Sequence, residues 1–520
     1  MHTAELVLGL LIAVAALVTI ARGLGIAYPI LLVIGGLLVG LVPGVPSIRV
    51  DPELIFLLVL PPLLYIAAYF TTVGDLQANV TTISSLAIGL VVASALAVAA
   101  VAHALLPDMP WSVAFALGAI VAPPDAVAAT AITARLAVPR QIVTILEGES
   151  LLNDATALTI YGIALAVAAG GAFAPGAVVL TFAGAMLGGG AVGLVVGGLV
   201  ANIRARLEDT PVEMTISLLT PYAAFLPAHW LGASGVIATV AAGIYLGHRG
   251  PRIMGADARL TGRALWETLT FLLNGFVFIV MGFEIPLLMR TLTVDTALRF
   301  VAIGVGVTVT LLVVRAGWIS ASVLLPQRLG GRADALSCSL VLSWAGMRGV
   351  VSLAAALALP TMLPTGAPLP SREAVMIVTL TVIVLTLLGH GLTLPRLIRA
   401  LRLGTDVGLR REEALARQRL VGAAMQRLDE LYPVWPGHRP LLDQLRETYR
   451  HRSEHVDHQR DTTSPDGEDR ELIEHREIRR TVIDAEREAL LRLRAEGAVN
   501  AEVLRNLERE LDLEERRMDA

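Results

Sequence analysis

Cysteine is almost missing from this sequence, which holds only Cys338 among its 520 residues. A disulfide within the chain is therefore excluded, and so is a zinc site built from several cysteines. Lysine is absent, so arginine supplies all of the fixed positive charge. The N-terminal stretch MHTAELVLGLL lacks the basic region of a cleaved signal peptide, so we expect it to begin the first membrane-spanning helix.

Charged side chains are also scarce over most of the chain. Residues 1–400 are nearly continuous apolar runs with glycine and proline, whereas residues 405–520 are rich in Arg, Glu, Asp and His. The chain is 55% apolar with a mean hydropathy of +0.68, above the roughly 45–50% apolar of soluble proteins. We expect a transmembrane domain over residues 1–400 and a cytoplasmic, charged helical tail over residues 405–520.

Apolar runs of membrane-spanning length recur along the first 400 residues. A helix needs about 20 apolar residues to cross the hydrocarbon layer. The sequence therefore predicts an all-α polytopic membrane protein with about thirteen transmembrane helices. Their expected extents are 4–21, 24–43, 52–70, 83–106, 111–133, 141–168, 176–202, 212–230, 233–247, 264–289, 296–325, 334–360 and 373–398.

Arginine is unevenly distributed over the short loops between these runs. Loops after odd-numbered runs hold Arg22, Arg135, Arg140, Arg204, Arg206, Arg249, Arg252, Arg259, Arg263, Arg328 and Arg332. Loops after even-numbered runs hold only Arg49, Arg290 and Arg372. Because basic loops stay in the cytoplasm, we expect a multi-pass protein of the cell membrane, with its N-terminus outside and its tail cytoplasmic.

Two of the predicted spans contain helix breakers. The fifth places Pro123 and Pro124 beside Asp125, and the twelfth places Gly346 and Gly349 around Arg348. Broken helices at membrane depth line cavities, and matching breaks in two halves of a chain mark a transporter's binding site. The two broken spans are seven apart and so run in opposite directions. This favours an inverted repeat in which spans one to six match spans eight to thirteen.

The segment EGESLLNDA, residues 147–155, places charge inside another apolar run. On a helix, Glu149 lies one turn from Asn153, and Ser150 lies one turn from Asp154. A charge at bilayer depth costs about 2.5–3.5 kcal/mol on the insertion scale. These groups must therefore face partners or a water-filled path. Glu147 lies near the start of the run, where a structural role is as well supported as a functional one.

Partners for these buried groups are sought at the two helix breaks. We expect Glu149 to form a structural ion pair with Arg348, and Asp154 to face Asp125 across the broken region. A carboxylate in a wet cavity holds either Na⁺ or a proton. Competition between the two ligands for one carboxylate produces exchange.

Two further charged residues lie in or near apolar spans. We expect Glu284 and Arg315 to reach the membrane interface by extending their side chains, rather than to join the buried site.

Five motifs together resemble the sodium/proton exchanger family, which includes bacterial NhaP-type and animal NHE-type proteins. They are EGESLLNDA, APPDAVAA (122–129), LPPLLYIAAY (60–69), WETLTFLLNGFVF (266–278) and SWAGMRGVVSLAAALALP (343–360). The resemblance implies a thirteen-span inverted-repeat fold, a homodimer and an elevator-like movement of a core domain. The tail segment NAEVLRNLERELDLEE (500–515) also resembles the end of bacterial members.

The resemblance also implies roles for individual residues. Asp154 would carry the cation and the proton, and Asn153 with Asp154 would be the Asn-Asp pair typical of electroneutral members. Asp125 and Ser150 would be further cation ligands, so that Asp154 and Asp125 bind Na⁺. Glu149 with Arg348 would match the family's structural pair.

The sequence departs from the family's pattern at two places. Many members carry an acidic residue in the third span, where this chain has Ile66, and many have Asp-Pro in the fifth span, where this chain has prolines before Asp125. Both departures leave the cation preference open.

The expected function is antiport of Na⁺, and of Li⁺ or K⁺ as further candidates, for H⁺, with no cofactor, no enzymatic activity and no nucleic-acid partner. A K⁺/H⁺ antiporter for which Na⁺ is a poor substrate is the alternative. A cation channel and an intramembrane hydrolase are weaker alternatives, because no filter-like repeat is present and no histidine lies near Ser150.

Overall fold

The computed structural model describes most of the chain as helix. The residues described are 2–24, 28–42, 52–133, 136, 138–171, 174–207, 209–289, 292–324, 332–364, 366–401 and 407–461, with isolated positions between 481 and 511. The only β-type pairing among them is an isolated bridge between Met362 and Pro368. The chain forms two compact units, Met1–Asp406 and Val407–Ala520.

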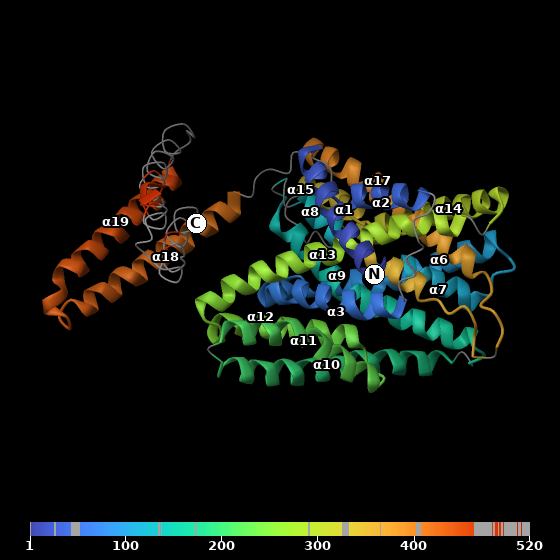
Figure 1. Ribbon diagram of the computed structural model, residues 1–520, viewed down its shortest axis with the longest axis horizontal. Coiled ribbons are helices and arrows are strands. Elements are labelled where there is room, and N and C mark those ends of the chain that lie inside the picture. The colour runs from blue at the N-terminus through green and yellow to red at the C-terminus, as the bar shows by residue number, and fades with distance from the viewer. Residues whose placement is uncertain are drawn as a thin grey trace. The chain divides into compact units, whose positions relative to one another are not determined.

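Unit 1 is a bundle of helices (Figure 1). In chain order these are α1 (His2–Leu24), α2 (Tyr28–Leu41), α3 (Pro52–Phe70), α4 (Val73–Ala78), α5 (Val80–Ser84), η1 (Ser85–Leu90), α6 (Val91–Leu105), α7 (Trp111–Val121), α8 (Ala126–Thr133), α9 (Arg140–Ala168), α10 (Pro175–Arg204), α11 (Thr210–Trp230), α12 (Gly235–Ile253), α13 (Ala256–Met289), α14 (Val294–Ile319), η2 (Ser320–Leu324), α15 (Arg332–Trp344), α16 (Val350–Leu357) and α17 (Arg372–Ala400).

Several of these helices have the length and composition of membrane spans. Within the described residues, six helices are long and apolar enough to cross a bilayer: Val80–Leu105, Arg140–Ala168, Gly176–Arg204, Asp257–Val280, Val294–Ser322 and Arg372–Ala400. Shorter apolar helices are Ile12–Ala21, Tyr28–Leu41, Leu57–Phe70 and Trp111–Val121. Each predicted extent holds one helix or a pair of consecutive helices, except 83–106, which holds the end of α5, η1 and α6. The two predicted breaks fall between α7 and α8 and between α15 and α16.

Local sequence sets where several helices begin. Asp209, Ser234 and Thr293 lie just before α11, α12 and α14, and each side-chain oxygen accepts a hydrogen bond from a backbone N–H in the first turn of its helix. Such caps satisfy donors that have no partner inside the helix. The boundaries of these spans therefore follow from residues that the sequence already shows.

The pairing of helices has the symmetry of an inverted repeat. The predicted repeat matches the second span to the ninth and the third to the tenth, which are α2 with α12 and α3 with α13. A two-fold relation then requires that a contact of α2 with α13 be matched by a contact of α12 with α3. Both contacts are present and extensive, and α14 packs on α6 as its self-matched pair.

Glycines bring the backbones of these paired helices close together. A Cβ added at Gly36 of α2 would lie 2.0 Å from the carbonyl oxygen of Ile279 in α13. A Cβ added at Gly247 of α12 would lie 2.1 Å from the carbonyl oxygen of Tyr69 in α3. Small residues permit such close packing where the hydrophobic effect does not drive helices together.

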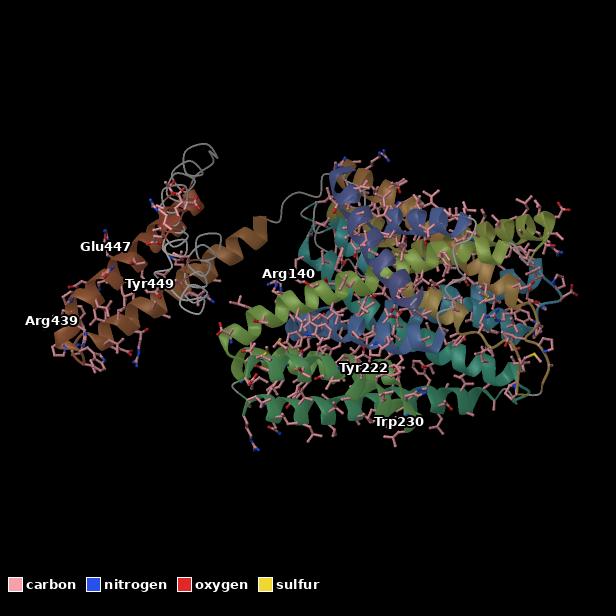
Figure 2. All side chains as sticks on the ribbon, in the orientation of Figure 1. Arg140, Tyr222, Trp230, Arg439, Glu447 and Tyr449 are labelled. Carbon is pink, nitrogen blue, oxygen red and sulfur yellow. The ribbon has the colours of Figure 1, made fainter. Side chains whose placement is uncertain are left out.

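The helices α10, α11 and α12 pack on one another at one edge of unit 1 (Figure 1). Tyr222, labelled on α11 in Figure 2, donates a 3.0 Å hydrogen bond to the carbonyl of Leu58 in α3. Trp230, at the end of the same helix, is 76% exposed. Its indole is suited to the membrane–water interface, where tryptophan is enriched.

Unit 2 begins with a helical hairpin formed by α18 (Val407–Leu431) and α19 (Arg439–Asp461), joined through the short η3 (Pro436–His438). Arg446 of α19 forms an ion pair with Asp429 of α18. The guanidinium groups of Arg439 and Arg446 lie 5.8 and 5.4 Å from the ring centre of Tyr432. The described part of the predicted tail is therefore helical; residues 462–480 and most of 482–520 lie outside the described residues.

Candidate functional site

The two helix breaks meet at their extended segments. The backbone N–H of Asp125 donates a 2.7 Å hydrogen bond to the carbonyl of Met347, and the Asp125 Oδ2 accepts a 3.3 Å hydrogen bond from the N–H of Val350. A Cβ added at Gly349 would lie 1.8 Å from that same Oδ2. The glycine is therefore required for the close approach of the Asp125 carboxylate to the start of α16.

Arg348 occupies the crossing point and has no carboxylate partner among the described residues. Its guanidinium donates hydrogen bonds to the carbonyls of Val121 at 3.0 Å and Ala122 at 3.3 Å, and to the carbonyl of Gly346. These carbonyls lie where α7 and α15 end, so their intrahelical partners are missing. Arg348 is only 2% exposed, and its positive charge stabilises the negative ends of two broken helices.

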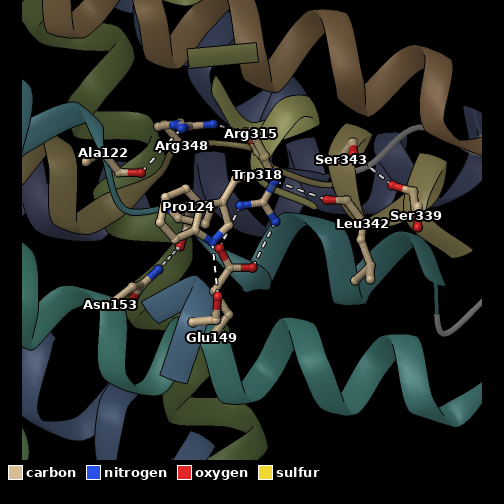
Figure 3. Close-up of polar contacts among 12 residues, drawn as sticks. Ala122, Pro124, Glu149, Asn153, Arg315, Trp318, Ser339, Leu342, Ser343 and Arg348 are labelled. Atoms are coloured by element: carbon tan, nitrogen blue, oxygen red, sulfur yellow. Dashed lines mark hydrogen bonds and ion pairs between the residues drawn. The ribbon is translucent and has the colours of Figure 1, made fainter. Parts of the chain in front are cut away.

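Glu149 of α9 pairs with Arg315 of α14 (Figure 3). The guanidinium Nη1 and Nη2 donate to Oε1 and Oε2 at 2.6 and 2.8 Å, and Nε donates to the carbonyl of Leu342 at 3.0 Å. Both side chains are 1% exposed. This two-point contact is the strong geometry for an arginine–carboxylate pair.

The predicted pair of Glu149 with Arg348 is therefore wrong in its choice of arginine. Arg348 is held by backbone carbonyls, and Arg315 takes both oxygens of Glu149. The prediction that Arg315 extends to the interface is wrong as well. Arg315 lies ten residues before the predicted span end at 325, about 15 Å along a helix, which is too deep for the headgroups. The side chain of Glu284 lies outside the described residues.

Asn153 connects α9 to the first helix break. Its Nδ2 donates a 2.8 Å hydrogen bond to the carbonyl of Pro124, as Figure 3 shows. The side chain is 0% exposed, and its Oδ1 is buried without a hydrogen-bond partner among the described residues. Because the proline ring ends the helical pattern here, the Pro124 carbonyl needs a donor from outside its own helix, and Asn153 supplies it.

A cavity of about 680 Å³ lies beside the crossing point. Asp154, Asp125 and Ser150, which the sequence placed in one site, all line it, and so does Glu147. Asp154 is 5% exposed and makes no hydrogen bond or ion pair with another residue in the described part of the chain. The structure thus places the carboxylates of Asp154 and Asp125 and the hydroxyl of Ser150 on the wall of one cavity.

The wall opposite α9 contains residues that sequence reasoning did not single out. They are the α13 residues Glu267, Thr270 and Asn274, which line the same cavity. Their spacing is a signal that was present in the sequence, since polar residues at i, i+3 and i+7 share one face of a helix. Ile66 of α3 also lines the cavity, so that helix contributes an apolar wall where a carboxylate was considered.

The donor set does not resemble a fixed metal centre. Within the described ranges, no group of three or more His, Cys, Asp or Glu side chains is placed to hold a metal ion. A cation here would be bound by few carboxylates together with neutral oxygens. Such a site suits a transported ion, which must also be released.

A helical membrane unit with two crossing broken helices and buried carboxylates at a cavity has the build of a secondary transporter. The family model described as "Sodium/hydrogen exchanger, transmembrane" matches residues 9–400. The chain belongs to this family. The family consists of cation/proton antiporters, and the resemblance inferred from the sequence motifs is confirmed.

Characterised and uncharacterised relatives extend the match. An uncharacterized Na⁺/H⁺ exchanger of Mycobacterium tuberculosis is 37% identical over 98% of this chain and 96% of the relative. A low-affinity Na⁺/H⁺ antiporter of Synechocystis is 31% identical over 79% of this chain and 77% of the relative. A sodium, potassium, lithium and rubidium/H⁺ antiporter of Bacillus subtilis is 29% identical over 78% of this chain and 62% of the relative.

The fold also matches a solved structure. The sodium proton antiporter MjNhaP1 of Methanocaldococcus jannaschii at pH 8 superposes with a TM-score of 0.58 at 19% identity, over 77% of this chain and 99% of that chain. A second structure of that protein gives a TM-score of 0.63 at 18% identity. The predicted all-α polytopic fold class is confirmed.

Proposed function

We propose that this protein exchanges Na⁺ for H⁺ across the cell membrane, with Li⁺ and K⁺ as further candidate substrates, and that Asp154 carries both ions. The observation that carries the proposal is the placement of Asp154. Its carboxylate is buried in the membrane unit, opens on a cavity, and makes no ion pair with another described residue. A lone carboxylate in this position destabilises the fold unless a proton or a cation occupies it.

Exchange follows from competition at this one group. A proton that binds Asp154 neutralises it, and a Na⁺ bound there does the same, so the occupied site has one charge state for either ligand. Asp125 and Ser150 supply further oxygens beside it, in keeping with the oxygen ligands that hard cations prefer. Movement of the occupied site between the two sides, by alternating access, then carries Na⁺ in one direction and H⁺ in the other.

The proposed stoichiometry is one cation for one proton. Asn153 precedes Asp154, and its Nδ2 donates a hydrogen bond to the Pro124 carbonyl. The position next to the carrier therefore holds a neutral amide that cannot take up a second proton. Arg315 neutralises Glu149, and Arg348 is held by carbonyls. If Asp154 alone changes its protonation during the cycle and Asp125 keeps its charge state, each half-cycle moves the same net charge, so exchange is electroneutral.

The test uses the purified protein in proteoliposomes with a pH-sensitive dye. Addition of Na⁺, Li⁺ or K⁺ separately is expected to dissipate a preset pH gradient. Clamping the membrane potential at several values, with K⁺ and valinomycin, is expected to leave the Na⁺-driven rate unchanged. If K⁺ proves to be a substrate, another permeant ion sets the potential. A rate that scales with the potential would contradict one-for-one exchange.

Preference for K⁺ over Na⁺ is the second candidate. It is favoured by Ile66, which leaves α3 with an apolar cavity wall, and by potassium being among the ions in the name of the Bacillus subtilis relative. Cation-dependent flux without proton movement would support a channel instead.

The proposal further includes a homodimer in the lipid bilayer, an external N-terminus, a cytoplasmic tail and no enzymatic activity.

A further inference from the structure

Two polar stripes face the same cavity from different helices. On α9 the stripe is Glu147, Ser150 and Asp154, and on α13 it is Glu267, Thr270 and Asn274. Both stripes have the spacing i, i+3, i+7, and both begin with a glutamate and continue with a hydroxyl. The α9 stripe ends in the carboxylate of Asp154, whereas the α13 stripe ends in the amide of Asn274.

Asn274 is a buried polar group with an unused acceptor. The residue is 1% exposed, and its Oδ1 has no hydrogen-bond partner among the described residues. A buried amide oxygen without a partner costs free energy and is rare in folded proteins. The residue lines the cavity that Asp154 and Asp125 also line, so a cation in that cavity is a partner of the right chemistry for this oxygen.

Tyr28 of α2 lies beside the Asn274 side chain. The Tyr28 side chain also lines the cavity and interacts with the charge of Asp125. Asn274 therefore lies in the polar neighbourhood of the first helix break rather than at a remote part of the wall.

The other wall of the cavity offers no substitute oxygen. The cavity-lining side chains of α3 are all apolar: Leu60, Leu63, Leu64, Ile66, Ala67 and Phe70. The predicted inverted repeat matches α3 with α13, so these two helices are the equivalent walls of the two halves. Of these two helices, only α13 has polar side chains among the described residues that line the cavity.

We propose that Asn274 Oδ1 is a neutral cation ligand that sets the preference among Na⁺, Li⁺ and K⁺. In this proposal Asn274 supplies the ligand oxygen that an acidic residue in the third span would supply, at the position where this chain has Ile66. Hard cations accept amide carbonyl oxygens as ligands beside carboxylates. A neutral oxygen adds no titrating group, so it contributes to cation binding without changing the number of protons exchanged. This inference rests on the proposed function, because its transport measurement requires that the protein exchange cations for protons at Asp154.

The experiment compares Asn274→Leu, which removes the oxygen and keeps the branching of the side chain, with Asn274→Asp, which keeps the oxygen and adds charge. The control is Thr268→Val on the same helix, because Thr268 is exposed and its hydroxyl bonds only its own helix at the Ala264 carbonyl. Half-saturating Na⁺, Li⁺ and K⁺ concentrations are measured in proteoliposomes. Thermal stabilisation of the detergent-solubilised protein by each cation is measured in parallel, without a proton gradient.

Asn274→Leu is expected to raise the half-saturating Na⁺ concentration about tenfold, to change the order of preference among the three cations, and to weaken their stabilising effect. Asn274→Asp is expected to restore cation binding and to make it more dependent on pH. Thr268→Val is expected to behave as the wild type. A purely structural role would lower rate and stability alike for all cations and leave their ratios unchanged.

Two results separate this inference from the proposed function. If the wild type moves no protons in response to cations, the exchange proposal fails, while the cation-dependent stabilisation still tests Asn274. Unchanged half-saturation, preference and stabilisation in Asn274→Leu would overturn the cation-ligand role. If Asn274→Leu does not fold, the same comparison is made with Asn274→Ser, whose side chain is too short to place its hydroxyl oxygen where Oδ1 lies. Wild-type cation dependence in Asn274→Ser would also overturn the proposal.

Discussion

Asp154→Asn is expected to reduce cation-dependent proton movement to the rate of empty liposomes. Asparagine keeps the shape of aspartate but cannot take up or release a proton, and it gives the cation a neutral oxygen in place of a charge. The protein should still fold, because a buried carboxylate without an ion partner in the described structure is destabilising. The variant is therefore expected to melt at the wild-type temperature or above it in detergent.

The measurement is the Na⁺-driven pH change in proteoliposomes of equal protein content. Asp295→Asn is the control, since Asp295 is an exposed carboxylate in the first turn of α14. It should retain wild-type exchange. Wild-type exchange by a folded Asp154→Asn protein would show that another group carries the ions, and Asp125 would be the next candidate.

Breaking the buried pair of Glu149 and Arg315 is expected to cost about 3–5 kcal/mol of stability. Either single change, Glu149→Gln or Arg315→Met, leaves one charge 1% exposed without its partner. The double variant removes both charges together and is expected to recover most of the loss, because neutral replacement of a whole buried pair is often nearly neutral. The loss of stability is measured for each variant as the fall in its thermal unfolding temperature in detergent.

A surface pair provides the matched control. Arg140 and Asp75 lie 2.8 Å apart, but their side chains are 50% and 37% exposed. Asp75→Asn should therefore cost about 1 kcal/mol or less. Glu149→Gln and Arg348→Met are expected to be additive, since these two residues form no ion pair. Additive losses for Glu149 and Arg315 instead would contradict the pairing seen in the structure.

The span pattern of the fold was readable from the sequence. Apolar length sets the number of residues that cross a bilayer, and proline and glycine mark where a helix must break. Pro123, Pro124, Gly346 and Gly349 lie between the described helices where the sequence predicted interruptions. The inverted repeat stays a prediction from the odd separation of the two breaks, and the contacts of α2 with α13 and of α12 with α3 agree with it.

The partners inside the site were less predictable. Asp154, Asp125 and Ser150 were recognisable because charge at bilayer depth needs a reason, and the structure places them on one cavity. The partner of Glu149 depended on which of two arginines reaches it. That is set by where the fold places Arg315 of α14 relative to α9, two helices far apart in the sequence. Asn274 escaped notice because a neutral amide in an apolar run carries no charge to signal burial.

The measurement that tests the central claim most directly is the Na⁺ dependence of exchange at several pH values. If Na⁺ and H⁺ compete for Asp154, the half-saturating Na⁺ concentration should rise by up to about tenfold for each unit of falling pH on the acid limb. Saturating Na⁺ should restore the maximal rate at these low pH values. The fall in rate on the acid side of the pH optimum therefore moves to lower pH as the Na⁺ concentration increases. A half-saturating Na⁺ concentration that stays constant across the acid limb, while the maximal rate falls, would contradict competition at a shared carboxylate.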